Sequence, residues 1–322
     1  MMTYREILEH FLTQFSWDPI VENKERLRPF KRIIVLAMGG SRLAPDMLNM
    51  YKPELDIRIH SDFGLPKFSR EHLEEALIIV SSYSGDTDEP LSGVQEALDQ
   101  NLNLAVITTG GALGDLMQKN QLPGVMIPSD SAVARESTGY GFLALAALLN
   151  IEILERKACA AITIEPIDAA GKALAAFIGN RIPLVYTSER FNELGYAWKL
   201  ILNETAKIPA FCNRFPELAH NEISGFGSSA AAGPATAGFA VVIIDDQGSP
   251  EISRRMAAVA EILEGKNIPT KIVPWQATSE LEGILSSYLL AHYTALYLAE
   301  QAGKDPLGTT IIEQLKEKMK KP

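Results

Sequence analysis

The stretch KRIIVLAMGGS, residues 31–41, places a run of β-branched and other apolar residues directly before two glycines and a serine. A helical pattern follows from Leu43 to Tyr51. This order predicts a strand that is buried on both faces, a tight turn and a helix, which together form the repeating unit of a parallel sheet. We therefore expect an α/β fold whose ligands bind at the carboxyl ends of its strands.

The same pattern recurs in two series. The first has predicted strands in 55–60, 75–85, 102–110 and 124–128, with helices in 89–100, 112–120 and 137–150. After a loosely patterned join at 151–166, the second has strands in 182–188, 239–246 and 270–275, and helices after 188, in 249–266 and in 279–301. We predict two subdomains, 1–152 and 153–322 with the C-terminal helices, each a mainly parallel sheet flanked by helices in an αβα sandwich. The segment 221–238 is rich in Gly, Ala and Ser and is expected to be a mobile loop.

Composition excludes several classes of protein. The chain has 322 residues, 47% of them hydrophobic, and a net charge of −10, so it is expected to be soluble and to bind no nucleic acid. Its start reads as an amphipathic helix and not as a signal peptide, and 283–299 reads as a buried or interface helix, so no membrane partner is expected. Its two cysteines, Cys159 and Cys212, lack metal or redox spacing, which indicates free buried thiols in a reduced, cytoplasmic compartment.

The segment SSYSGDTDEP, residues 81–90, combines hydroxyls with a helix start. A helix that begins after Thr87 or Asp88 leaves unbonded amides at its first turn, and these can bind a phosphate with the hydroxyls of Ser82, Ser84 and Thr87. The alternative is that these residues only cap the helix. A second turn on the same edge favours the phosphate site; it is formed by Gly39, Gly40 and Ser41. Neither turn has the dinucleotide or Walker A pattern.

Five motifs, in order along nearly the whole chain, carry a family resemblance. They are MGGS at 38–41, SSYSGDT at 81–87, RESTGY at 135–140, LNETAKIPA at 202–210 and ELAHNEISGF at 217–226. Together they resemble the bifunctional phosphoglucose/phosphomannose isomerases of the sugar isomerase (SIS) superfamily. The resemblance implies two SIS subdomains, a homodimer, and an aldose-ketose isomerase that interconverts glucose 6-phosphate or mannose 6-phosphate with fructose 6-phosphate through a cis-enediolate. It implies no metal and no organic cofactor.

Moving a proton between C1 and C2 of a sugar phosphate requires a carboxylate base, a cation near the developing oxyanion and a group that opens the ring. By resemblance, Glu204 is the base, Arg135 stabilises the intermediate, and His220 opens the ring from the neighbouring subunit. Without the motifs, Glu204 would read as a solvated residue, Arg135 as a surface guanidinium and His220 as a packed or solvated histidine.

The C-terminal helix resembles the family's last segment. Lys316 is similar to the lysine that completes the pocket, although nearby Lys318, Lys320 and Lys321 also fit a solvated helical face. Thr309 or Thr310 fits the threonine that gives the substrate room to rotate about its C2–C3 bond. We take Thr309 as the candidate.

Three positions depart from the family pattern. Arg42 follows GGS where a small residue is usual, Asp86 stands where Asn is common, and Ala134 replaces the proline before the arginine. These departures bear on substrate and catalytic rate more than on fold. Arg42 in particular could narrow the sugar site or add a phosphate contact.

Two other functions remain open from the sequence. A sugar-phosphate-binding regulatory SIS protein would use the hydroxyl turns without catalysis, but it would not need the base, and no helix-turn-helix pattern accompanies the turns. An amidotransferase-type isomerase acting on amino sugars would need a glutaminase domain, and none is found in these residues. The presence of Glu204, Arg135 and His220 together favours the isomerase.

Overall fold

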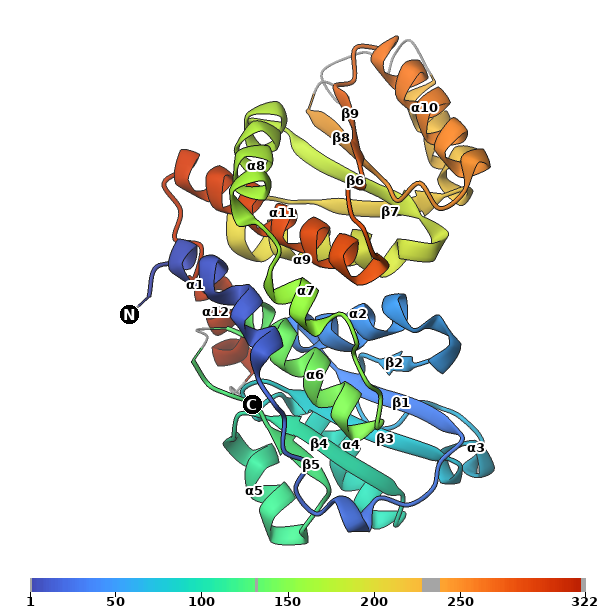
Figure 1. The fold of residues 1–322 in the computed structure, drawn as a ribbon, viewed down its shortest axis with the longest axis vertical. Helices are drawn as coiled ribbons and strands as arrows, with labels where there is room; N and C mark the ends of the chain where they lie inside the picture. The colour runs from blue at the N-terminus through green and yellow to red at the C-terminus, as the bar shows by residue number, and fades with distance from the viewer. Residues whose placement is uncertain (1, 131–132, 228–237, 320–322) are drawn as a thin grey trace. The chain divides into compact units, whose positions relative to one another are not determined.

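The structure is a computed structural model that describes residues 2–130, 133–227 and 238–319. The chain divides into two compact units (Figure 1). The N-terminal unit comprises Ile7–Ile162 and Glu280–Ile284, and the C-terminal unit comprises Met1–Glu6, Thr163–Ser279 and Leu285–Pro322. The subdomain boundary expected between residues 152 and 153 stays a prediction.

The N-terminal unit is built on a parallel sheet with strand order β2-β1-β3-β4-β5. Its strands are β1 (Arg32–Ala37), β2 (Arg58–His60), β3 (Ala76–Ser82), β4 (Asn103–Thr108) and β5 (Gly124–Met126). Its helices are α2 (Leu43–Tyr51), α3 (Arg70–Glu74), α4 (Asp88–Asp99), α5 (Gly111–Asn120), α6 (Thr138–Leu148) and α7 (Arg156–Ala160), while α1 (Tyr4–Phe11) begins in the C-terminal unit and continues into this one.

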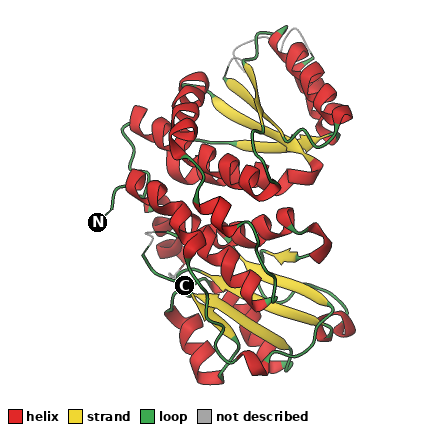
Figure 2. Cartoon of the chain, viewed as in Figure 1, coloured by secondary structure: helices red, strands yellow, loops and turns green. Residues whose placement is uncertain are grey.

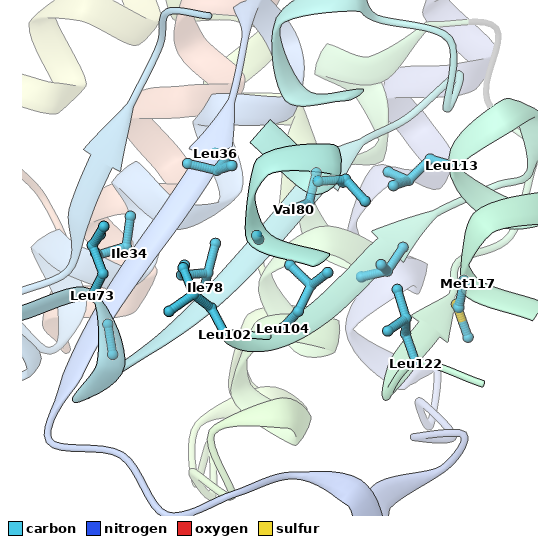
Figure 3. Close-up of a cluster of buried hydrophobic side chains, with 14 residues drawn as sticks. Ile34, Leu36, Leu73, Ile78, Val80, Leu102, Leu104, Leu113, Met117 and Leu122 are labelled. Carbon is cyan, nitrogen blue, oxygen red and sulfur yellow. The ribbon is translucent and has the colours of Figure 1, made fainter. Parts of the chain in front are cut away.

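Both faces of this sheet are buried, as the apolar runs predict. On one face, alternate strand residues such as Ile34, Ile78 and Leu104 pack with side chains of α3, α4 and α5 (Figure 3). The intervening residues of the other face, among them Val35 and Ile79, are fully buried too. Burial of each such side chain contributes about 1.5–3 kcal/mol relative to exposure, so the sheet centre is rigid and fixes the turns at its carboxyl edge.

The C-terminal unit repeats this topology. Its parallel sheet has the order β7-β6-β8-β9, which matches β2-β1-β3-β4 strand for strand. Figure 2 shows strands in yellow with helices in red beside them in each unit. Its strands are β6 (Ile182–Ser188), β7 (Phe211–Phe215), β8 (Phe239–Asp245) and β9 (Thr270–Pro274), and its helices are α8 (Ile164–Ile178), α9 (Asn192–Ile201), α10 (Pro250–Glu264), α11 (Glu280–Gln301) and α12 (Thr310–Met319). The prediction of two α/β units, each with a parallel sheet and flanking helices, is confirmed.

Some local predictions are wrong. The expected join at 151–166 contains α7 and the start of α8, and the strand β7 was not foreseen. Within the segment predicted to be a loop, Glu222–Phe226 forms a 3₁₀ helix, because Glu222 is held by side chains of the sheet. The glycine- and alanine-rich part of that prediction, 228–237, lies outside the described residues.

The long helix α11 is buried, as predicted for 283–299, with Leu285 and Leu289 fully inaccessible. Among the helices that the structure describes, none combines the length and the apolar character needed to cross a membrane.

Candidate active site

The first glycine turn is shaped by a close approach of two backbones. After β1, Gly39–Arg42 forms a 3₁₀ turn that leads directly into α2, and Gly39 has a left-handed φ of 50°. A Cβ atom on Gly40 would lie 2.7 Å from the backbone nitrogen of Arg135. Only glycine fits there without moving the backbone, so Gly40 is what allows the turn to contact the Arg135 segment.

The turn after β3, residues 81–87, is called the serine turn, and it is hydrogen-bonded to the glycine turn. Ser41 Oγ accepts a hydrogen bond of 3.0 Å from the backbone N–H of Tyr83, which follows β3. Ser82 is buried, and its Oγ accepts from the N–H of Gly85 at 3.2 Å and lies 3.1 Å from Thr87 Oγ1. Ser82 therefore fixes the shape of the turn from inside.

Ser84 and Thr87 are the hydroxyls left at the surface of this turn. Ser84 is exposed, and Thr87 is half-buried at the N-terminus of α4. Thr87 makes no side-chain capping bond to the helix, so the reading of these residues as helix caps finds no support in its geometry. The helix dipole and the first amides of α4 favour an anion beside these two hydroxyls.

The structure gives a role to Asp86, the second departure from the family pattern. Its Oδ1 accepts a hydrogen bond of 2.9 Å from the N–H of Ala112, in the first turn of α5. A carboxylate is stabilised at a helix N-terminus by the helix dipole. Asp86 thus braces the serine turn against α5, and its side chain is already engaged there.

Arg135 is deeply buried. It lies in the 3₁₀ turn Ala134–Ser137, just before α6, and its side chain is only 1% exposed. Its Nε lies 3.0 Å from Oε1 of Glu136, which is 0% exposed. The interpretation of Arg135 as a surface guanidinium is therefore wrong. The Glu136 carboxylate offsets the cost of burying the guanidinium, because an unpaired buried charge would be strongly destabilising.

Arg42, the first departure from the family pattern, is also held by a carboxylate. Its Nε lies 3.0 Å from Oδ2 of Asp46, one turn further along α2, and Asp46 is 1% exposed. The Arg42 side chain remains 28% exposed. The glycine turn, the serine turn and the two arginine side chains are thus assembled within one unit.

Glu204 lies in an uncommon helical turn of the C-terminal unit. The helix α9 continues into a π-helix, Leu202–Ala206, and Glu204 is half-buried at its centre. The next residue, Lys207, has a left-handed φ of 59° and donates hydrogen bonds from its Nζ to the backbone oxygens of Glu204 and Gly308. π-Helical turns are rare and frequent at functional sites.

Lys207 links the turn of Glu204 to the segment that contains Thr309. Thr309 Oγ1 donates to Glu313 Oε1 at 2.6 Å, across the first turn of α12. Lys316 lies further along α12 and is exposed, as are the other described residues of that helix. Lys207 thus connects the backbone of Glu204 with that of Gly308, the residue before Thr309, whereas Lys316 lies on an exposed helix.

His220 ends a 3₁₀ turn and is exposed. Two residues later, Glu222 accepts hydrogen bonds from Tyr186 Oη on β6 and from Asn213 Nδ2 on β7, the latter at 2.5 Å. Burial, followed by the bond to Glu222, raises the pKa of Tyr186 above its usual value. Two strands therefore anchor the segment that carries His220, although the side chain of His220 faces solvent.

The sequence-predicted residues thus fall into two groups. The N-terminal unit holds the seven residues Gly39, Gly40, Ser41, Ser82, Ser84, Thr87 and Arg135, and the C-terminal unit holds Glu204, His220, Thr309 and Lys316. Sequence reasoning did not single out Lys207, Glu222 or Tyr186. Lys207 and Glu222 lie inside the quoted motifs, which could have drawn attention to them, whereas Tyr186 carries no such signal.

Neither cysteine is part of this arrangement. Cys159 and Cys212 are free thiols, the first buried and the second half-buried, so the prediction of burial is correct only for Cys159. Burial raises the pKa of Cys159 to about 12. Across the described ranges, no cluster of three or more His, Cys, Asp or Glu side chains is placed to hold a metal ion.

Known proteins resemble this chain over most of its length. Residues 167–319 match the model of the bacterial phospho-glucose isomerase C-terminal SIS domain. The bifunctional phosphoglucose/phosphomannose isomerase of Aquifex aeolicus is 27% identical and covers 98% of both chains. The enzyme of the same name from Thermoplasma volcanium is 28% identical and covers 90% of this chain and 92% of its own.

A solved structure shares the fold at lower identity. The glucosamine-6-phosphate deaminase of Thermotoga maritima has a TM-score of 0.67 with 14% identity over 94% of each chain. This likeness concerns the fold alone. The family model and the near full-length relatives thus show that the chain is similar to the bifunctional phosphoglucose/phosphomannose isomerases, and that residues 167–319 match a SIS domain.

Proposed function

We propose that the protein is an aldose-ketose isomerase that interconverts glucose 6-phosphate and mannose 6-phosphate with fructose 6-phosphate. The observation that carries the proposal is the linkage of the glycine turn, through Gly40 and Ser41, to the Arg135 segment and the serine turn. This linkage assembles hydroxyls, helix amides and a buried guanidinium at one carboxyl edge of a parallel sheet, where such folds bind ligands. The enzyme names of the relatives favour this function over a non-catalytic sensor.

The chemistry assigns a role to each group. The phosphate binds Ser84, Thr87 and the first amides of α4. His220 assists ring opening by moving a proton between the anomeric hydroxyl and the ring oxygen. The Glu204 carboxylate then removes the proton from C2 of the open aldose and returns it to C1, while Arg135 stabilises the negative charge on the enediolate oxygens. Thr309 and Lys316 act on the sugar as the family resemblance implies, and no metal or organic cofactor takes part in these steps.

A coupled assay on the purified protein tests this function. Glucose 6-phosphate and mannose 6-phosphate are supplied separately, with and without a chelator, and the formation of fructose 6-phosphate is followed. We expect both epimers to react, because both reach the same enediolate once the C2–C3 bond rotates. If neither epimer yields fructose 6-phosphate, the proposed function is wrong; strict glucose specificity would overturn only the proposed breadth.

We further propose that the protein is a cytoplasmic homodimer in which His220 reaches the site of the neighbouring subunit. The support is that His220 is exposed although its segment is anchored by Glu222. A closed dimer with two-fold symmetry would place two such residues in reciprocal positions.

Mixing two inactive variants tests the dimer. A heterodimer of Glu204→Gln with His220→Ala contains one intact site, so an equal mixture after subunit exchange should recover at most about a quarter of the wild-type activity. Each variant alone should stay inactive under the same treatment. A mixture that remains inactive, although exchange is demonstrated with labelled subunits, would show that both groups come from one chain.

A further inference from the structure

A buried polar network lies directly behind the turn of Glu204. Thr205, the next residue, is fully buried, and its Oγ1 lies 3.0 Å from Tyr4 Oη. The same Tyr4 Oη lies 2.5 Å from Nδ1 of His292, which is also fully buried. Three residues from α1, the π-helix and α11 are thus joined through one phenolic oxygen.

The start of α1 is fixed independently of this network. Arg5 Nη1 lies 3.2 Å from both carboxylate oxygens of Asp168 on α8, and the Arg5 guanidinium stacks over the ring of Tyr297 on α11, 5.2 Å from its centroid. The ring of His292 packs edge-on against Tyr288 with centroids 4.7 Å apart. Tyr4 and His292 are therefore held in place by these neighbours, and Thr205 is bonded to Tyr4.

All three side chains are buried, and buried polar groups are costly unless each finds a partner. The Tyr4 hydroxyl has one proton, so it can donate at most one of the bonds to Thr205 and His292. Hydrogen bonds between buried side chains of this kind restrain the backbone segments to which they are attached.

We propose that Tyr4, acting through Thr205, is a positioning residue for the candidate base Glu204. This inference rests on the proposed function, in which Glu204 moves the C2 proton. The π-helix interrupts the regular i→i−4 bonding of α9, and the bond from Tyr4 to Thr205 holds that irregular turn from the buried side, while Lys207 holds it at the Glu204 and Gly308 oxygens. Neither Tyr4 nor Thr205 touches the substrate; they set where the carboxylate lies.

The expected effect is on the proton-transfer step. A displacement of a catalytic group by about 1 Å can cost on the order of a hundredfold in rate. Tyr4→Phe removes one hydroxyl and keeps the ring, so we expect kcat to fall by about 10- to 100-fold while KM stays within about twofold. Because proton transfer is the step that slows, the isotope effect on kcat with C2-deuterated glucose 6-phosphate should be at least as large as that of the wild type.

Matched variants separate positioning from general destabilisation. Tyr51→Phe also removes a tyrosine hydroxyl bonded to a side chain, Glu155. That bond involves neither the π-helix nor a residue of the candidate site, so the substitution should leave kcat and the isotope effect unchanged. Thr205→Val should reproduce the loss seen with Tyr4→Phe, and Thr205→Ser, which retains the hydroxyl, should restore most of kcat. The Thr205 pair keeps the inference testable if Tyr4→Phe fails to fold.

The full experiment measures kcat, KM, the isotope effect and the unfolding midpoint for the wild type and these variants. A folded Tyr4→Phe protein with kcat within about twofold of the wild type would overturn the inference, as would a reduced kcat accompanied by a smaller isotope effect. A wild-type protein that isomerises neither sugar phosphate would instead refute the proposed function, so the two failures are distinguishable.

Discussion

Glu204→Gln is expected to lower kcat by a factor of about 100 to 10,000 with little change in KM. Glutamine keeps the size of the side chain and can still form hydrogen bonds, but it cannot take up the proton from C2, and the stated range is typical of losing a general base. The phosphate is bound elsewhere in the proposed site, so substrate affinity should be nearly preserved. Steady-state kinetics with glucose 6-phosphate measure both constants.

The matched control for that variant is the double substitution Ser84→Ala with Thr87→Ala. Removing these two hydroxyls of the serine turn should raise KM strongly and affect kcat less. Glu204→Gln is expected to do the reverse, lowering kcat and leaving KM nearly unchanged. If Glu204→Gln isomerises at nearly the native rate, Glu204 is not the base. If the double variant keeps the native KM, the phosphate binds at another place.

Arg135→Met is expected to cost about 3–5 kcal/mol of stability in addition to activity. Arg135 and Glu136 are 1% and 0% exposed and form an ion pair of 3.0 Å, so removing the guanidinium leaves a buried carboxylate without this partner. Removing one partner of a buried ion pair typically lowers the free energy of unfolding by about this amount. Denaturant unfolding followed by circular dichroism measures the change.

Two further variants test whether burial of the ion pair causes the loss of stability in Arg135→Met. Arg70→Met breaks an ion pair whose partners, Arg70 and Glu74, are 65% and 53% exposed, and it should cost less than about 1 kcal/mol. Substituting Arg135→Met and Glu136→Leu together should regain most of the lost stability, because no charge remains unpaired, but not the activity. An Arg135→Met protein as stable as the wild type would contradict the described environment of this pair.

The sequence was sufficient to predict the sheet and the turns at its edge. Runs such as 33–37 and 76–80 are apolar on both faces, which only a covered parallel sheet accommodates, and the glycines and hydroxyls after them mark the sheet edge. The strand β7 could not be predicted in this way. Among the strands of the described ranges it pairs with β6 alone, and it carries Asn213 and Arg214, so its pattern lacks the apolar run of an inner strand.

Three features of the candidate site had no local signal. The π-helix around Glu204 is defined by its i→i+5 backbone hydrogen bonds, which residue composition does not predict. The burial of Arg135 runs against the usual exposure of arginine and depends on Glu136 being buried beside it. The bonds of Tyr4 to Thr205 and His292 join residues 201 and 288 positions apart, a separation over which residue pattern carries no information.

The most direct test of the account is the release of tritium from C2-tritiated glucose 6-phosphate. The central claim is that Glu204 removes the C2 proton on the way to an enediolate, so part of the label should exchange with water while the carboxyl group carries it. The account predicts that the wild-type protein releases tritium to water while fructose 6-phosphate forms, and that Glu204→Gln loses tritium release and product formation in the same proportion. Tritium release by Glu204→Gln at the wild-type rate would contradict it.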